Sequence, residues 1–183
     1  WKDFGHNRTK ALEHAFGKSD YLFIFDADDV IEGNMNLPLI LDKDCYNITI
    51  SENSASYYRP VLISNKLKWK YMGVLHEYIV PIDTKNSEEY LVGDYCILSR
   101  RLGNRSKNPD KYLDDAILLE NAYNSETDTG LQARYAFYCA QSYKDSGRND
   151  ISIKWYTKVL TLCNWYQEKY YSCLMLGNLY RDK

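Results

Sequence analysis

The hydrophobic positions of the chain follow two different periods. Between residues 1 and 107, apolar residues run together or alternate with polar ones, which is typical of β-strands. From residue 108 to 183 they recur every three or four positions, which indicates amphipathic helices. We therefore predict an α/β domain with a mixed sheet over 1–107, followed by an all-α region of helical hairpins over 108–183.

One helix and five strands are expected in the first region. Leu12, Ala15 and Phe16 lie on one helical face, and Gly17 follows as a C-terminal stop. The strand candidates are 21–25, 46–51, 57–64, 69–80 and 90–98, with a hairpin turn at 52–56. Because 21–25 is an unbroken apolar run after a helix, we expect it to be buried on both faces, as in a parallel sheet.

Four helices with short connections are expected in the second region. The first follows the start signal Asn108-Pro109-Asp110. The others are predicted at about 132–146, 150–163 and 167–180, with Gly147 ending the second.

A short repeat lies within these helices. Ala140-x-x-Tyr143 recurs as Gly177-x-x-Tyr180, which is 37 residues further along the chain. This pattern resembles the tetratricopeptide repeat, in which a small residue lets two helices approach and a tyrosine fills the gap beside it. Asn164 stands where that family usually has proline, and an ordinary helical bundle is the alternative.

Composition excludes several classes of partner. The net charge of the chain is -2, so no basic excess favours nucleic acid, and no apolar run is long enough for a transmembrane helix. The N-terminal residues lack the apolar core of a signal peptide. Five scattered cysteines without a CxxC pair argue against a disulfide framework or a zinc site. We expect a cytoplasmic protein, in the host cytoplasm if the tyrosine- and asparagine-rich composition is viral.

The densest chemical signal is the acidic cluster Asp26, Asp28 and Asp29, which follows the apolar run directly. Ligands of open α/β sheets bind at the carboxyl ends of strands. If the chain stays extended, Asp26 and Asp28 point to the same side and offer hard oxygen donors for Mg²⁺ or Mn²⁺. The alternative is a solvated acidic turn that caps a following helix.

Two other families share parts of this pattern. An EF-hand requires glycine at the sixth loop position, where this chain has Ile31, so we exclude it. A phosphatase of the haloacid dehalogenase type begins with an apolar run and DxD, with Asp26 as nucleophile and Asp28 as acid/base. Its later acidic motif needs an aspartate where Leu98 stands. This phosphatase remains an alternative.

Residues 4–33 resemble family 2 glycosyltransferases of the GT-A fold, in which a helix carrying an Asn/Arg pair leads to a strand that ends in DxD. Here the pair is Asn7-Arg8 and the motif is Asp26-Ala27-Asp28. The segment KWKYMGVLHEYI resembles the acceptor side of such enzymes. The helices after residue 107 resemble a subgroup in which tetratricopeptide repeats follow the transferase domain, so the resemblance covers nearly the whole chain.

The resemblance implies metal-dependent, inverting transfer of a sugar from a UDP- or GDP-linked donor to a hydroxyl of a glycan, lipid or protein. Mn²⁺ or Mg²⁺ would neutralise the leaving diphosphate. Asp28 would be the direct metal ligand, and Asp26 would bind the ribose or the metal. Asp29 would touch the donor sugar or cap the next turn, and Asn7 and Arg8 would contact the donor.

Inversion requires a base that takes the proton of the acceptor hydroxyl, and Glu77 is the candidate. His76 would be a third metal ligand or a buried, hydrogen-bonded histidine; on a regular strand it faces away from Glu77. The basic residues Arg100, Arg101, Arg105 and Lys107 would clamp the diphosphate or form a solvated loop.

In the resembling family an N-terminal βαβ unit that binds the nucleotide base precedes the segment seen here. We therefore expect weak or no transferase activity from this chain alone. The alternative function is a protein-binding module that uses the helical repeats, with a vestigial acidic site.

Overall fold

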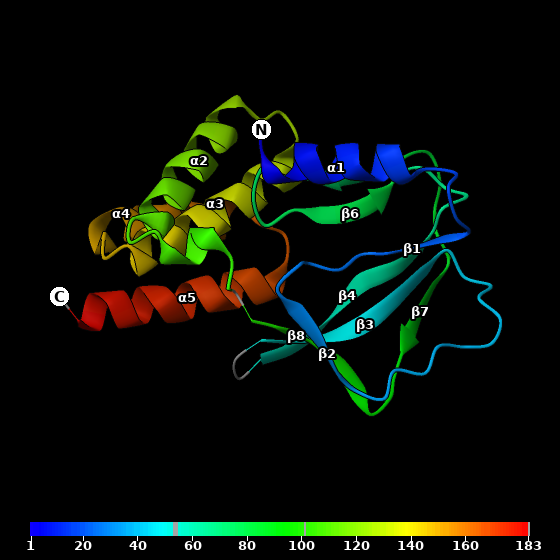
Figure 1. Cartoon of the computed structure of the whole chain (residues 1–183). Helices are drawn as coiled ribbons and strands as arrows, with labels where there is room; N and C mark the ends of the chain where they lie inside the picture. Colours follow the sequence, from blue (N-terminus) through cyan, green and yellow to red (C-terminus); the bar gives the residue numbers. More distant parts are fainter. Residues whose placement is uncertain (53–54, 101, 183) are drawn as a thin grey trace. The chain divides into compact units, whose positions relative to one another are not determined.

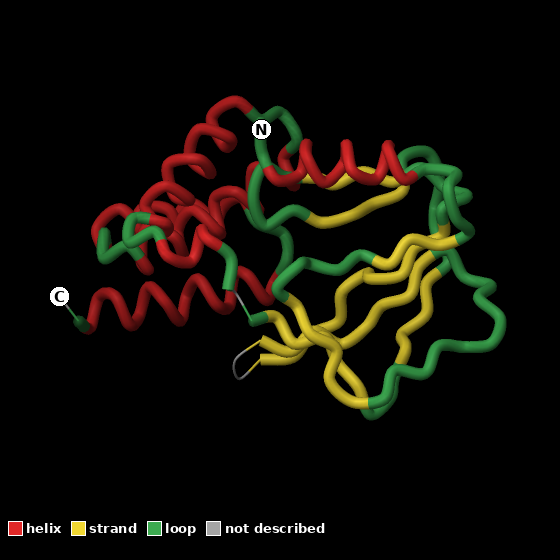
Figure 2. Tube along the Cα trace, viewed as in Figure 1, coloured by secondary structure: helices red, strands yellow, loops and turns green. Residues whose placement is uncertain are grey.

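The computed structural model describes residues 1–52, 55–100 and 102–182, and their backbone is drawn in Figures 1 and 2. The chain forms two compact units. The sheet unit consists of His6–Tyr71 and Ile79–Ser106, and the helical unit consists of Trp1–Gly5, Met72–Tyr78 and Lys107–Lys183.

The sheet unit is built on a mixed six-stranded sheet (Figure 2). Its strands are β1 (Tyr21–Phe23), β2 (Asp29–Gly33), β3 (Cys45–Glu52), β4 (Ala55–Ser64), β7 (Glu88–Leu91) and β8 (Tyr95–Ser99). They follow the order β1-β4-β3-β8-β2, with β7 also paired to β3. β7 and β8 run parallel to β3, whereas the other pairs are antiparallel. A mixed sheet followed by helices confirms the prediction that an α/β region precedes an all-α region.

The central strand β3 carries the core of this sheet. Tyr46, Ile48 and Ile50 are fully buried, together with Val61 on β4 and Ile97 on β8. The runs of apolar residues at 46–51 and 57–64 were therefore correctly predicted as strands. The predicted turn at 52–56 lies partly outside the described residues, because the structure does not describe 53–54.

The prediction for 21–25 was wrong about the length of the strand, its pairing and its burial. β1 ends at Phe23 and pairs with β4 in antiparallel fashion, with Leu22 opposite Ile63. Phe23 and Phe25 are each about two-fifths exposed. Because β1 lies at an edge of the sheet, its apolar residues are covered on only part of their surface.

Two long strands predicted from the sequence are each divided. Residues 69–80 contain β5 (Trp69–Met72) and most of β6 (Tyr78–Pro81), which pair as a two-stranded sheet. Gly73 (φ 101°) and His76 (φ 54°) lie between them with positive φ, so the backbone of this connection departs from the extended conformation. Residues 90–98 likewise contain the end of β7 and most of β8, separated at 92–94.

The helical unit contains α2 (Lys111–Ser125), α3 (Thr129–Asp145), α4 (Asn149–Leu162) and α5 (Tyr166–Arg181), each packed on the next (Figure 1). All four were predicted within a few residues. Their shared core includes the fully buried residues Ala116, Leu119, Cys139, Ala140, Tyr156 and Val159. None of the helices in the described part of the chain is long and apolar enough to cross a membrane.

Two shorter elements complete the chain. α1 (Phe4–Ala15) is followed by Gly17 at φ 73°, as the sequence predicts for a helix stop. The 3-10 helix η1 (Asn104–Lys107) follows β8.

Candidate functional site

The acidic cluster forms a turn between β1 and β2. The backbone N–H of Asp29 donates to the carbonyl of Asp26 at 3.0 Å, which closes residues 26–29 into what we call the acidic turn. The chain is not extended here, so the strand alternation that would place Asp26 and Asp28 on one side does not apply.

Arg8 of α1 is the partner of Asp26. Its Nη2 atom lies 2.7 Å from Asp26 Oδ1, and its guanidinium carbon lies 5.6 Å from the centre of the Tyr71 ring. The neighbouring Thr9 Oγ1 accepts from the Tyr71 N–H at 2.9 Å. Three segments that are far apart in the sequence, α1, the acidic turn and β5, therefore meet at one guanidinium. Asn7 precedes Arg8 on α1 and is half-buried.

Asp28 binds the segment that follows β8. Its Oδ2 atom accepts from the backbone N–H of Leu102 at 2.7 Å and of Gly103 at 3.1 Å. Arg100 Nε in turn donates to the Asp28 carbonyl at 2.8 Å. The predicted basic segment thus lies against the acidic turn, a contact that the sequence did not indicate. Arg101 lies outside the described residues, and Arg105 and Lys107 are part of η1.

Asp29 begins β2 and has little access to solvent. Its side chain is only 2 % exposed, and the nearest cation is Arg59 Nη2 at 3.7 Å from Oδ2. Burial raises the pKa of Asp29, and the charge of Asp26 adds to this effect. A carboxylate this buried would have to be uncovered before it could contact a donor sugar.

The acidic turn by itself brings too few ligands together to hold a divalent ion. Among the residues that the structure describes, no three or more His, Cys, Asp or Glu side chains are grouped closely enough to hold a metal ion. Mg²⁺, however, is commonly bound by one or two carboxylates together with substrate phosphates and water. Asp26 and Asp28, two carboxylates of one turn, match that kind of donor set.

His76 and Glu77 belong to the helical unit and lie just before β6. The His76 ring stacks on Tyr138 of α3, with ring centres 3.9 Å apart and planes within 8°. The carbonyl oxygen of His76 accepts from Arg134 Nε at 2.9 Å and Nη2 at 2.7 Å. Because His76 has a left-handed backbone, the strand rule that placed it opposite Glu77 does not hold.

Arg134 is the site residue that sequence reasoning missed. Its guanidinium lies 5.0 Å from the ring centres of both Tyr78 and Tyr138. Arg134 and Tyr138 are four residues apart on α3, so they share a helical face. That spacing was a signal, but nothing in the sequence connected it with residue 76.

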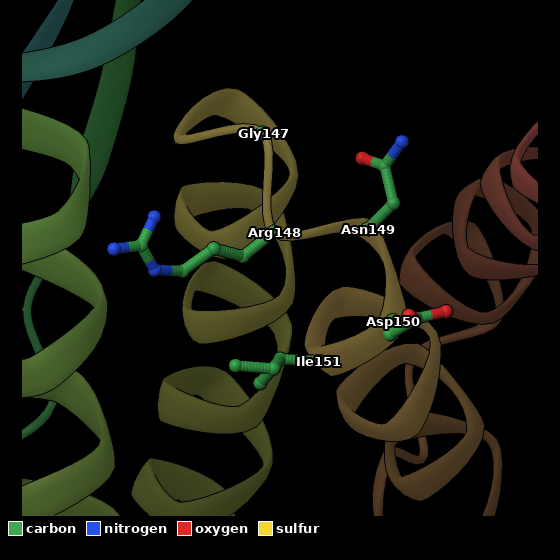
Figure 3. Close-up of a pocket in the computed structure, with 5 residues that line it drawn as sticks. All are labelled: Gly147, Arg148, Asn149, Asp150 and Ile151. Carbon is green, nitrogen blue, oxygen red and sulfur yellow. The ribbon is translucent and has the colours of Figure 1, made fainter.

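Two surface hollows lie outside the predicted residues. One, of about 440 Å³, lies at the turn between α3 and α4, where the side chains of Arg148, Asn149 and Asp150 point in different directions and do not converge on one point (Figure 3). The other, of about 340 Å³, lies in the sheet unit and is lined mainly by apolar residues, including Phe16 and Trp69.

The predicted residues are therefore divided between the two units. The sheet unit brings Arg8 to Asp26, and Arg100, Leu102 and Gly103 to Asp28. The helical unit contains His76 and Glu77, with Arg134 bound to the His76 carbonyl. No family model matches the chain, and no curated protein matches it.

Proposed function

We propose that this chain is part of a metal-dependent, inverting glycosyltransferase that uses a nucleotide-sugar donor. In this proposal the sheet unit is a partial GT-A-like domain and the helical unit is a tetratricopeptide-like region. One observation carries it: the acidic turn contacts Arg8 through Asp26, and Arg100, Leu102 and Gly103 through Asp28. Carboxylates and cations therefore meet in the turn between β1 and β2, and both kinds of group would serve recognition of a diphosphate bound with a metal ion.

Departure of a nucleoside diphosphate places negative charge on its phosphate oxygens, which must be neutralised. Asp26 and Asp28 would hold Mn²⁺ or Mg²⁺, which when bound acts as a Lewis acid toward the leaving group. The Arg8 guanidinium, already at the turn, can donate two parallel hydrogen bonds to phosphate oxygens. Asp28 keeps the backbone at 102–103 in place and thereby keeps Arg100 beside the turn.

On the acceptor side, Glu77 would take the proton of the attacking hydroxyl. The two hydrogen bonds from Arg134 fix the peptide that joins His76 to Glu77. His76 would then orient Glu77 through the backbone.

Thermal shift measurements with UDP, GDP and their sugars, with and without Mn²⁺, test the proposal. We expect a Mn²⁺-dependent rise in Tm with at least one nucleotide, and its loss in Asp28→Asn. This substitution retains an oxygen that can accept from Leu102 and Gly103, so the loop contact is preserved while the charge is removed. Asp83→Asn, at an exposed position of the same unit, is the matched control and should keep the shift.

Two results would count against a nucleotide-sugar site. One is the absence of any shift with every nucleotide and either metal. The other is a shift that survives Asp28→Asn, because the ligand would then bind elsewhere.

A further inference from the structure

Two residues of the acidic turn lie against arginines from distant parts of the sheet unit. Arg8 Nη2, on α1, donates to Asp26 Oδ1 at 2.7 Å. Arg100, which directly follows β8, donates from Nε to the carbonyl oxygen of Asp28 at 2.8 Å, so a second positive charge lies at the turn. The side chains of Arg8 and Asp26 are 32 % and 35 % exposed. A dissolved ion can therefore reach this ion pair from solvent.

A third arginine, Arg59 of β4, lies beside the buried carboxylate of Asp29. Its Nη2 atom is 3.7 Å from Asp29 Oδ2, and the Arg59 side chain is one-third exposed. Within the residues that the structure describes, this buried Oδ2 atom accepts no hydrogen bond. A buried carboxylate oxygen without a hydrogen-bond donor keeps a strong attraction for cations, because its charge has lost the water that would otherwise offset it.

The three arginines balance the three carboxylates of the turn when no ligand is bound. A divalent ion bound by itself at Asp26 would lie close to the Arg8 guanidinium, and the two cations would repel each other. A diphosphate bound by itself at Arg8 would bring its negative charges close to the carboxylates. Joint binding avoids both conflicts, because Asp26 exchanges Arg8 for the ion while Arg8 exchanges Asp26 for a phosphate oxygen.

We propose that the Arg8–Asp26 ion pair makes the acidic turn bind a divalent metal ion and a diphosphate together, and each of them only weakly alone. Arg59 and Arg100 maintain the charge balance during this exchange, since they stay beside Asp29 and Asp28. The inference rests on the proposed function, because it concerns the donor side of the same site. It adds that the ion pair holds the turn closed to either ligand alone.

Removal of either partner of the ion pair should change two kinds of binding in opposite directions. Arg8→Gln removes the competing cation from Asp26 but also removes a phosphate contact. We expect Mn²⁺ alone to bind at least about fivefold more tightly, and Mn²⁺ with pyrophosphate at least about tenfold more weakly, within the ordinary range of coupling between two sites. Asp26→Asn is the mirror case. Pyrophosphate alone should bind more tightly, because the carboxylate no longer holds Arg8, and the joint binding should weaken.

The full chain is titrated with Mn²⁺, with pyrophosphate and with both, since pyrophosphate contains the phosphate–phosphate unit common to UDP and GDP. Electron paramagnetic resonance measures unbound Mn²⁺, and calorimetry in metal-free buffer measures pyrophosphate. Association of the two ligands in solution is the same for every variant and cancels in the comparison. Lys10→Gln is the matched control, because it removes one positive charge from the same helix at an exposed ion pair with Glu13. It should change each affinity by less than about twofold.

Three results would overturn the inference. In the first, the original chain binds Mn²⁺ or pyrophosphate alone as tightly as it binds the two together. In the second, it binds none of the three. In the third, Arg8→Gln weakens the binding of Mn²⁺ alone or leaves it unchanged, as general damage to the turn would.

The proposed function can fail separately from this inference. Opposite effects of Arg8→Gln with pyrophosphate, but no Mn²⁺-dependent shift in Tm with any nucleotide, would support the exchange and reject a nucleotide-sugar site. A nucleotide shift without the opposite effects would support the nucleotide-sugar site and reject the exchange.

Discussion

Replacement of Arg134 by methionine is the most direct test of how the loop at residues 76–77 is held. Methionine retains much of the apolar stem but removes both hydrogen bonds to the His76 carbonyl and the contacts with the Tyr78 and Tyr138 rings. Two hydrogen bonds from a charged donor at a partly exposed site contribute about 1–2 kcal/mol together. Two cation–π contacts add about 0.5 kcal/mol each. The expected loss is therefore about 2–3 kcal/mol.

Urea unfolding followed by circular dichroism at the helical band measures this loss. With a slope of about 2 kcal/mol per M, the midpoint should fall by about 1–1.5 M. Arg134→Lys keeps the charge and one hydrogen bond but not the planar contact with the rings, so roughly half of the loss is expected. A methionine variant with the midpoint of the parent chain would refute the idea that Arg134 holds His76 in its left-handed conformation.

Three other measurements address buried groups. Tyr156→Phe should raise the free energy of unfolding by about 1 kcal/mol, because the buried Tyr156 hydroxyl has no hydrogen-bond partner in the described part of the chain. A lower urea midpoint in this variant would contradict the prediction. Asp29→Asn should raise the free energy of unfolding at about pH 7. The pKa of Asp29 is raised in the folded state, so its ionisation opposes folding. The gain in free energy should therefore shrink as the pH falls toward 3.8, where Asp29 becomes protonated. An advantage that is the same at both ends of this range would show that burial does not raise the pKa of Asp29. Thiol reagents should modify Cys173 well before Cys45, since burial raises the pKa of the Cys45 thiol to about 12; equal rates would indicate that the sheet opens readily.

The helices could be predicted closely because their signals are local. α3 ends near the predicted residue because Gly147, at φ 76°, allows the Arg148 N–H to reach the Tyr143 carbonyl at 2.8 Å. Its start is fixed by Asp128, whose Oδ1 accepts from the Leu131 N–H at 2.8 Å. Such contacts span only a few residues, so the sequence contains both partners side by side.

The strands were harder to predict because their burial depends on distant partners. The apolar run at 21–25 has the composition of a central strand, but its neighbour β4 lies far along the chain, with Leu22 opposite Ile63. Among the described residues no strand pairs with the other side of β1. β2 was not predicted, because DVIEG has too few alternating residues to stand out before its partner β8 is known.

The acidic cluster could be found in the sequence, but its contacts could not. Aspartates at three of four positions after an apolar run mark a candidate site wherever they occur. That Asp26 faces Arg8, that Asp28 binds the amides of Leu102 and Gly103, and that Asp29 is buried depend on how the turn closes and which strands meet there.

Periodicity, caps and residue chemistry, all readable along the chain, determined the order of classes, the four C-terminal helices and the candidate carboxylates. The pairing of the strands, the left-handed conformation at His76 and the contacts of the acidic turn were decided by tertiary structure. The physical reason is the distance along the chain that separates the interacting residues. A helix forms its hydrogen bonds within four residues, whereas a strand edge or a buried carboxylate acquires its surroundings only when distant segments pack.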